Sequence, residues 1–350
     1  MCIIAGYVGT QQAAPLLVEM LRKTEGIDAG HYTGITTIDG GKIHYRKVVG
    51  DLEQLLSRTD AAQLPGTIGI IHSRTPGDRA QKDAWSHPFT CEQDGEVKTS
   101  VVFNGTLGFY KEQYKEYFLP IAESLLEDGF ELKTAIPANG AVPCLPNGMR
   151  IHQSDLRTQY ASRMILNGTD TVTAMEKTLC AMPAEVIGLM LSVTEPDAIT
   201  WGRTSFPMHV SFADHGAYLA TVPLAFPEDG GETLLLPAAS AGLIRKDGYT
   251  CRPLRDFPGK VASITPEIWA TAYEKIIEHI RQGEYKNFGN LFKHLFRDGE
   301  IYQANAVSWQ VLSYLYKQGR LKMENERVPG SAEGLTAPRT HYTILDEHIS

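Results

Sequence analysis

Cysteine is sparse in this sequence, and no pair of cysteines has the spacing of a disulfide scaffold or a metal site. Five cysteines are spread widely over 350 residues, and no C-x-x-C motif occurs. A disulfide framework or a structural zinc site needs closer and repeated spacing, so the pattern excludes both. An odd number of widely spaced cysteines is typical of a protein whose thiols stay reduced, so we expect a cytoplasmic protein. We also expect no bound metal, because no cluster of ligands has the spacing of a metal site.

Long apolar runs and an excess of basic charge are missing as well. No stretch of ~18 apolar residues occurs, and the first residues lack a basic leader, so we expect neither a transmembrane helix nor a signal peptide. Lys and Arg number 33 against 41 Asp and Glu, a balance that disfavours broad nucleic-acid binding. No P-loop or glycine-rich dinucleotide fingerprint appears, so no cofactor is predicted.

The apolar content supports a folded chain of the α+β class. Hydrophobic residues make up 43% of the sequence, and at ~100–200 residues per domain the default expectation is two domains. Over residues 1–258, strand-like segments lie at both ends and helix-like segments between them, which predicts a layered α+β fold. Helices are expected at 11–23, 52–56, 117–126, 156–166 and 171–182, and strands at 3–8, 34–45, 67–72, 99–103, 185–193, 198–201, 208–212, 217–221 and 240–253.

A change in composition near Pro258 and Gly259 predicts a second domain, residues 259–350. Thr265 and Pro266 form a helix start, with Thr as the cap and Pro in the first turn. Three predicted helices and a hairpin resemble a winged-helix module with a partner-binding or regulatory role. DNA binding is disfavoured, because Lys317 is the one basic residue of the candidate recognition helix. The expected elements are helices at 265–280, 288–296 and 303–317 and a hairpin of 321–324 with 341–344.

Cys2 becomes the N-terminal residue once Met1 is removed, as happens when the second residue is small. The new terminus carries a thiol and an α-amine whose ordinary pKa values lie near ~8.5 and ~7.7–8.0, so the amine can accept the thiol proton. Retention of Met1 locks that nitrogen in a peptide bond and prevents this chemistry. Taken alone, Cys2 fits better as a small buried hydrophobe at the start of a strand than as a nucleophile.

Five short motifs follow one another along the first 258 residues. They are Met1-Cys2-Ile3-Ile4-Ala5-Gly6, Gly69-Ile70-Ile71-His72-Ser73-Arg74, Ser86-His87-Pro88-Phe89, Phe103-Asn104-Gly105 and Ser154-Asp155. In sequence and order they resemble the motifs of the class II glutamine amidotransferases, such as the glutaminase domains of glucosamine-6-phosphate synthase and amidophosphoribosyltransferase. The resemblance covers about residues 1–258 and implies an N-terminal-nucleophile hydrolase fold, a four-layer αββα sandwich.

The resemblance implies a role for five residues. Cys2 attacks the side-chain amide of L-glutamine and forms a thioester. Asn104, through its side-chain NH₂, and Gly105, through its backbone N–H, stabilise the oxyanion. Arg74 binds the α-carboxylate and Asp155 the α-ammonium of the free amino acid.

Each of these residues also has a plainer interpretation. Asn104-Gly105 is a common hairpin turn, Arg74 is of a type mostly found at the surface, and Asp155 stands where a helix cap is expected. His72 and His87 we interpret as structural. The order and spacing of the whole set favour the functional interpretation.

The sequence departs from the family pattern at several points. Ile3 follows the nucleophile where Gly is usual, Phe103 replaces a His, and residues 75–79 and 28–32 differ from the family segments. About 90 residues follow the glutaminase part, too few for the synthase domains of the named relatives. We therefore expect an enzyme that hydrolyses glutamine and supplies ammonia to a separate synthase subunit, or acts as a homo-oligomer. The alternative is a non-catalytic amino-acid sensor with a C-terminal interaction module, DNA being one conceivable partner.

Overall fold

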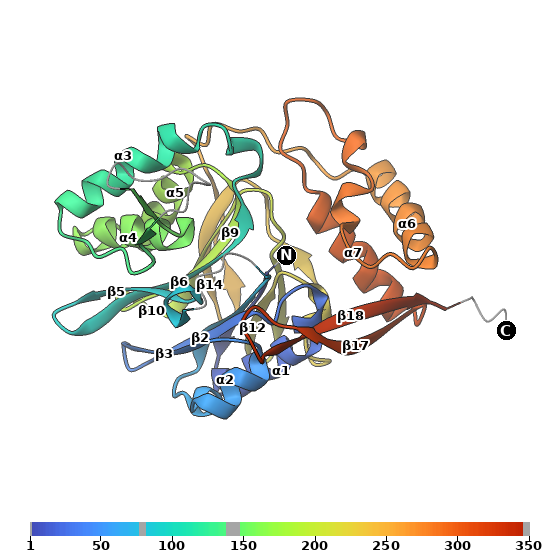
Figure 1. Ribbon diagram of the computed structural model, residues 1–350, viewed down its shortest axis with the longest axis horizontal. Helices are drawn as coiled ribbons and strands as arrows, with labels where there is room; N and C mark the ends of the chain where they lie inside the picture. Colours follow the sequence, from blue (N-terminus) through green and yellow to red (C-terminus); the bar gives the residue numbers. More distant parts are fainter. Residues whose placement is uncertain (1, 77–81, 138–147, 346–350) are drawn as a thin grey trace.

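The computed structural model describes residues 2–76, 82–137 and 148–345. Two seven-stranded sheets pack face to face, and helices cover both outer faces (Figure 1). Every strand pairing within the two sheets is antiparallel. The expected α+β class is confirmed, and the described chain has the αββα order of layers.

The first sheet is built around the N-terminal strand β1. Its residues from Ile3 to Tyr7 are fully buried, as a continuous apolar run predicts for a central strand. β4 pairs with β1 so that Ile3 lies opposite Ser73, and β2 pairs with β4 so that Tyr32 lies opposite Arg74. This register places the first residues of β1 beside the last residues of β4, at the same end of the strands. The sheet has the order β13 (Leu234–Leu235), β11 (His209–Ala213), β12 (Gly216–Ala220), β1 (Ile3–Gly9), β4 (Ile68–Arg74), β2 (Tyr32–Asp39), β3 (Lys42–Val49).

The second sheet carries the segment that faces the N-terminus. β6 pairs with β9 from Thr99 to Thr106, and Asn104 and Gly105 lie opposite Ile187 and Val186. The sheet has the order β15 (Gly248–Tyr249), β14 (Ser240–Arg245), β10 (Glu195–Arg203), β9 (Glu185–Ser192), β6 (Glu96–Thr106), β5 (Phe89–Gln93), and β16 (Arg252–Pro253) also pairs with β14.

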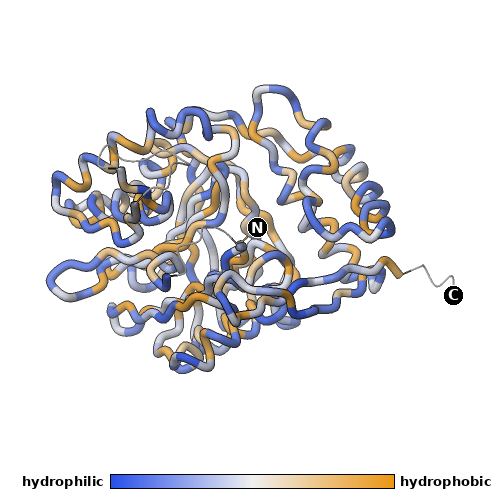
Figure 2. Tube along the Cα trace, in the orientation of Figure 1, coloured by the Kyte–Doolittle hydropathy of each residue, from blue (hydrophilic) through white to orange (hydrophobic). Residues whose placement is uncertain are grey.

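Helices bury the outer face of each sheet. Leu17 and Leu21 of α1 lie on one apolar stripe and pack on the first sheet. Met175 and Leu179 of α5 do the same on the second sheet. The hydrophobic segments of the chain follow the strands between these layers, whereas loops and outer helix turns are hydrophilic (Figure 2). The covering helices are α1 (Ala13–Thr24) and α2 (Leu52–Arg58) on the first sheet, and α3 (Tyr114–Glu127), α4 (Gln153–Leu166) and α5 (Thr171–Ala181) on the side of the second.

The C-terminal part contains α6 (Pro266–Arg281), α7 (Ala304–Lys317) and a long hairpin of β17 (Leu321–Pro329) and β18 (Thr336–Ile344). The Thr265 hydroxyl accepts a hydrogen bond from the Ile268 backbone N–H at 3.3 Å, which confirms the expected cap. Trp309 is 6% exposed, as expected for a core position.

One predicted helix of this part is wrong. Residues 288–296 form two short 3-10 turns, Phe288–Asn290 and Lys293–Leu295. Phe292, between the two turns, has φ −134° and ψ 19°, which an α-helix does not accept. Phe288, Phe292 and Phe296 are all buried, so tertiary packing holds the segment in this form. A winged-helix fold is therefore not confirmed, and the domain boundary at 258/259 stays a prediction.

Buried charges tie the C-terminal part to the layered part. Arg203 of β10 is 1% exposed, and its guanidinium donates to the Gln303 side-chain oxygen at 2.5 Å. Asp51 caps α2 by accepting from the Gln54 backbone N–H at 3.0 Å, and Arg327 of β17 donates to its second oxygen at 2.5 Å. Loss of the Gln303 side chain removes one acceptor from the buried Arg203 guanidinium, and loss of Arg327 leaves the buried Asp51 carboxylate without its cation. Both contacts therefore favour one docking geometry.

Candidate active site

Cys2 lies directly before β1, beside the end of β4. Its Sγ is 4.0 Å from the Thr75 hydroxyl, and its side chain is half-buried. Since Ile3 pairs with Ser73, the thiol lies at the edge of the sheet to which Arg74 and Thr75 belong. The nucleophile expected from the sequence is therefore partly accessible, next to a cationic side chain.

Asn104 reaches the backbone of the candidate nucleophile. Its Nδ2 donates to the Cys2 carbonyl oxygen at 2.6 Å, and the residue is 1% exposed. An amide NH₂ has two hydrogens, so one donor remains for another acceptor. The hairpin-turn interpretation of Asn104-Gly105 is wrong, because both residues lie within β6.

Gly105 occupies a position that no other residue fits. Its φ is +154°, and a Cβ there would lie 2.1 Å from the Glu185 carbonyl oxygen and 2.7 Å from the Val186 Cα. These neighbours are backbone atoms of the paired strand, which cannot move aside. Glycine at this position lets two strands approach closely beside Asn104.

Arg74 lies at the end of β4 between two aromatic rings. Its guanidinium carbon is 5.1 Å from the centre of the Tyr32 ring and 5.9 Å from that of Trp85. The buried Nη1 has no hydrogen-bond partner within the described residues. Burial lowers the pKa of Arg74, and the nearby Cys2 acts in the opposite direction. A buried donor without a partner is costly, and a carboxylate arriving here satisfies it.

Among the residues that the structure describes, no hydrogen bond joins Asp155 to Cys2, Arg74 or Asn104. It lies in the first turn of α4, 1% exposed. Its carboxylate accepts from the Thr134 N–H and hydroxyl at 2.9 and 2.8 Å and from Gln159 Nε2 at 3.2 Å. Burial raises its pKa, whereas those hydrogen bonds lower it. The cap of α4 is His152, which accepts from the Ser154 N–H at 3.1 Å, so the interpretation of Asp155 as the helix cap is wrong.

Three histidines fill the space behind Arg74. The rings of His72 and His87 stack with centroids 3.9 Å apart, and His152 meets His87 edge-on at 5.6 Å. Burial lowers the pKa of His72 to about 3, and the positive charge of Arg74 contributes. Burial also lowers the pKa of His87 well below its ordinary value. Such weak bases pack in the neutral form, in keeping with the structural role expected for His72 and His87.

Glu25 is buried behind the nucleophile edge of the first sheet. Its carboxylate accepts from the Ser73 hydroxyl at 2.8 Å, the Leu52 N–H at 2.9 Å and the Thr33 hydroxyl at 3.2 Å. Burial nevertheless raises the pKa of Glu25 to about 7, and these hydrogen bonds only partly oppose that effect. The residue was not singled out by any sequence signal.

Sequence reasoning also missed the aromatic and hydroxyl neighbours of the site. Thr75 contacts the thiol, and Tyr32 and Trp85 flank Arg74. Thr75 and Tyr32 lie in the segments 75–79 and 28–32, whose departure from the family pattern is the signal that could have found them. Trp85 reaches the site through a loop, which has no sequence signature.

Known proteins match the chain over most of its length. No family model matches the sequence. A glutamine–fructose-6-phosphate aminotransferase of Pyrococcus horikoshii is 24% identical over 325 residues, which are 90% of this chain and 48% of that protein. The enzyme of the same name from Chlorobaculum tepidum is 23% identical over 334 residues, 94% of this chain and 46% of its own length. The chain is a homologue of these aminotransferases. Its homologues are enzymes, in agreement with the expectation from the sequence.

The fold of this aminotransferase homologue agrees with the sequence matches. A glutamine phosphoribosylpyrophosphate amidotransferase of B. subtilis, solved with ADP and GMP, superposes with a TM-score of 0.58 at 13% identity. That superposition covers 92% of this chain and 66% of the solved one. The chain spans about half the length of the aminotransferases named above. Its matches reach past residue 258, so the likeness extends further than the motifs indicated.

No helix among the described residues of the homologue is long and apolar enough to cross a membrane.

Proposed function

We propose that the chain hydrolyses the side-chain amide of L-glutamine to glutamate and ammonia, with Cys2 as the nucleophile after removal of Met1. The observation that supports this most strongly is the convergence of three motif residues on one point. Asn104 bonds the Cys2 backbone at 2.6 Å, and Arg74, with its unpaired Nη1, lies at the strand end that faces Cys2. These residues come from three strands far apart in sequence.

The proposed reaction begins with proton transfer inside one residue. The α-amine of Cys2 accepts the thiol proton, and the thiolate attacks the side-chain carbonyl carbon of glutamine. The free N–H of Asn104 Nδ2 and the Gly105 N–H stabilise the oxyanion. The α-ammonium returns a proton to the departing nitrogen, so that ammonia leaves and a thioester remains. Water then cleaves the thioester and releases glutamate and the thiol.

Two charged groups select the substrate in this proposal. Arg74 binds the α-carboxylate with its unpaired guanidinium nitrogen, and the rings of Tyr32 and Trp85 hold the guanidinium in place. Asp155 is assigned the α-ammonium of glutamine. Its carboxylate already accepts three hydrogen bonds, two at one oxygen and one at the other, which leaves one lone-pair site for the ammonium.

The ammonia is proposed to pass to a separate synthase subunit in the cytoplasm. The chain spans 48% and 46% of the two aminotransferases it matches, so the other half of those proteins has no counterpart within it. Residues 259–350 are proposed to be the domain that contacts this partner or regulates the glutaminase.

The test is glutamate release from free L-glutamine by protein whose mass shows that Met1 is absent. Wild-type protein is expected to release glutamate and ammonia in equal amounts, and Cys2→Ala neither. Glutamine binding by calorimetry without product release would instead support the amino-acid sensor. Turnover by Cys2→Ala equal to the wild type would refute the assignment of the nucleophile.

A further inference from the structure

A cavity of about 790 Å³ lies between the layered part and the C-terminal part. One wall is the loop from Gly26 to His31 together with Pro76. The other walls are the segment after α6, the first half of α7 and the hairpin β17–β18. The cavity is large enough for a small metabolite, and its walls come from both ends of the chain.

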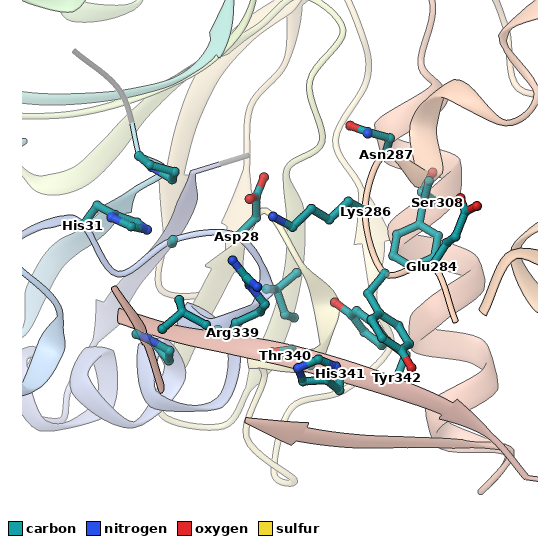
Figure 3. Close-up of a pocket in the computed structure, with 18 of the residues that line it drawn as sticks. Asp28, His31, Glu284, Lys286, Asn287, Ser308, Arg339, Thr340, His341 and Tyr342 are labelled. Atoms are coloured by element: carbon teal, nitrogen blue, oxygen red, sulfur yellow. The ribbon is translucent and has the colours of Figure 1, made fainter. Parts of the chain in front are cut away.

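Charged side chains from both walls converge in the centre of this cavity. Figure 3 shows the carboxylate of Asp28, the ammonium of Lys286 and the guanidinium of Arg339 pointing toward one another. Lys286 makes no ion pair within the part of the chain that the structure describes. The ion pair found for Arg339 is a long one, 3.9 Å to the half-exposed Glu326. Two permanent cations face one carboxylate, so the centre of the cavity carries net positive charge.

The remaining titratable groups of the cavity do not cancel that charge. Glu284 is engaged by His279 at 3.0 Å and lies away from the centre in Figure 3. His341 contacts Glu326 at 2.7 Å, and His31 is bonded to the Ser331 hydroxyl at 2.8 Å. Burial lowers the pKa of His31, and the charges of Arg339 and Lys286 also lower it, while Asp28 acts in the opposite direction.

The cavity wall also carries neutral polar side chains. Asn287, Asn290 and Asn305 contribute side-chain amides to the wall formed by the segment after α6 and the start of α7. An amide can donate from its NH₂ and accept at its oxygen, so this wall suits a ligand with polar groups beside its charge.

We propose that this cavity binds a small organic anion whose phosphate or carboxylate group is held by Lys286 and Arg339. Hydroxyl or carbonyl groups of the ligand accept from the asparagine amides of the cavity wall. The two cations lie on different elements, Lys286 in the segment after α6 and Arg339 on the hairpin strand β18. The bound anion therefore links these two elements of the C-terminal part. The proposal is independent of glutamine hydrolysis, so Cys2→Ala is expected to bind the anion as the wild type does.

The experiment is isothermal calorimetry on the full chain with two groups of probes. Glycerol 3-phosphate and ribose 5-phosphate represent phosphate esters, and succinate and citrate represent carboxylates. Saturable binding by at least one group is expected, at least ten-fold weaker in Lys286→Ala and in Arg339→Ala. Lys317→Ala, an exposed lysine of α7 outside the cavity, is the matched control and is expected to bind like the wild type.

Two results would overturn this proposal. One is the absence of saturable binding by all four probes at low ionic strength, where attraction between charges is least screened. The other is binding that Lys286→Ala and Arg339→Ala both retain at full strength. Lys286 is exposed, so its variant is expected to fold, and unchanged thermal unfolding verifies that weaker binding is not a folding defect. The group of probes that binds decides between a phosphate ester and a carboxylate.

Discussion

Replacing Asn104 with alanine tests the proposed oxyanion site without touching the nucleophile. The substitution removes the Nδ2 that donates to the Cys2 carbonyl at 2.6 Å, together with the second N–H of the same amide. It leaves the strand pairing of β6 intact, because that pairing uses the backbone. The thiol and α-amine of Cys2 and the guanidinium of Arg74 all remain in place.

Two separate losses are expected from this change. The loss of one oxyanion donor costs about 10²–10³ in kcat, or about 3–4 kcal/mol of transition-state stabilisation. The loss of the bond to Cys2 leaves a carbonyl without its donor, at a cost of about 1–3 kcal/mol in the free energy of unfolding. Because the oxyanion exists only after attack, the KM for glutamine is expected to change little.

Steady-state glutamate release and urea unfolding measure the two losses separately. Asn167→Ala is the matched control, since Asn167 is exposed at the C-terminal end of α4, and both values are expected to equal those of the wild type. A kcat for Asn104→Ala within three-fold of the wild type, or a raised KM with unchanged kcat, would contradict the proposed role.

Three further predictions concern neighbouring groups. Arg74→Lys is expected to raise the KM for glutamine about 10–100-fold with a smaller effect on kcat, because Lys cannot reproduce the bidentate fork; equal KM values in initial-rate assays would exclude carboxylate binding by Arg74. Gly105→Ala is expected to unfold at a lower urea concentration than the wild type and to lose activity, because the added Cβ would lie 2.1 Å from a backbone oxygen. Gly248→Ala is the control: a Cβ there has no atom within 4 Å, so its unfolding midpoint and activity are expected to equal those of the wild type. The raised pKa of Glu25, about 7 against 4.5 for an unperturbed side chain, means that the protonated form is favoured by folding. That stabilisation of the wild type is complete below pH ~4.5 and is lost as the pH rises to ~7. A glutamine at this position does not titrate, so the free energy of unfolding of Glu25→Gln is expected to rise relative to the wild type by up to about 3 kcal/mol over this range. Urea unfolding at several pH values measures the difference, and curves of stability against pH that run parallel for the two proteins would refute it.

The layered part could be predicted from the sequence because its signals are local. Continuous apolar runs marked the buried strands, and 3.6-residue periodicity marked α1 and α5. The motif order identified Cys2, Arg74 and Asn104, which strand register then brings to one edge. That register is a long-range property, so the sequence alone could not reveal the contact between Asn104 and the Cys2 backbone.

The rest depended on packing that has no local signature. The apolar spacing of Phe288, Phe292 and Phe296 fits a helix, yet all three rings are buried and the non-helical angles of Phe292 divide the segment into two 3-10 turns. Asp155 matched a motif, but its buried hydrogen bonds to Thr134 depend on a loop that the sequence does not place. The cavity between the two parts arises from the docking of the hairpin and could not be predicted.

The most direct test is intact-mass analysis combined with a product assay on the same sample. The account predicts a mass lower by one methionine, with glutamate and ammonia formed in equal amounts from L-glutamine and neither formed by Cys2→Ala. A protein that retains Met1 and still hydrolyses glutamine would contradict it, because the nitrogen of Cys2 could then not accept the thiol proton.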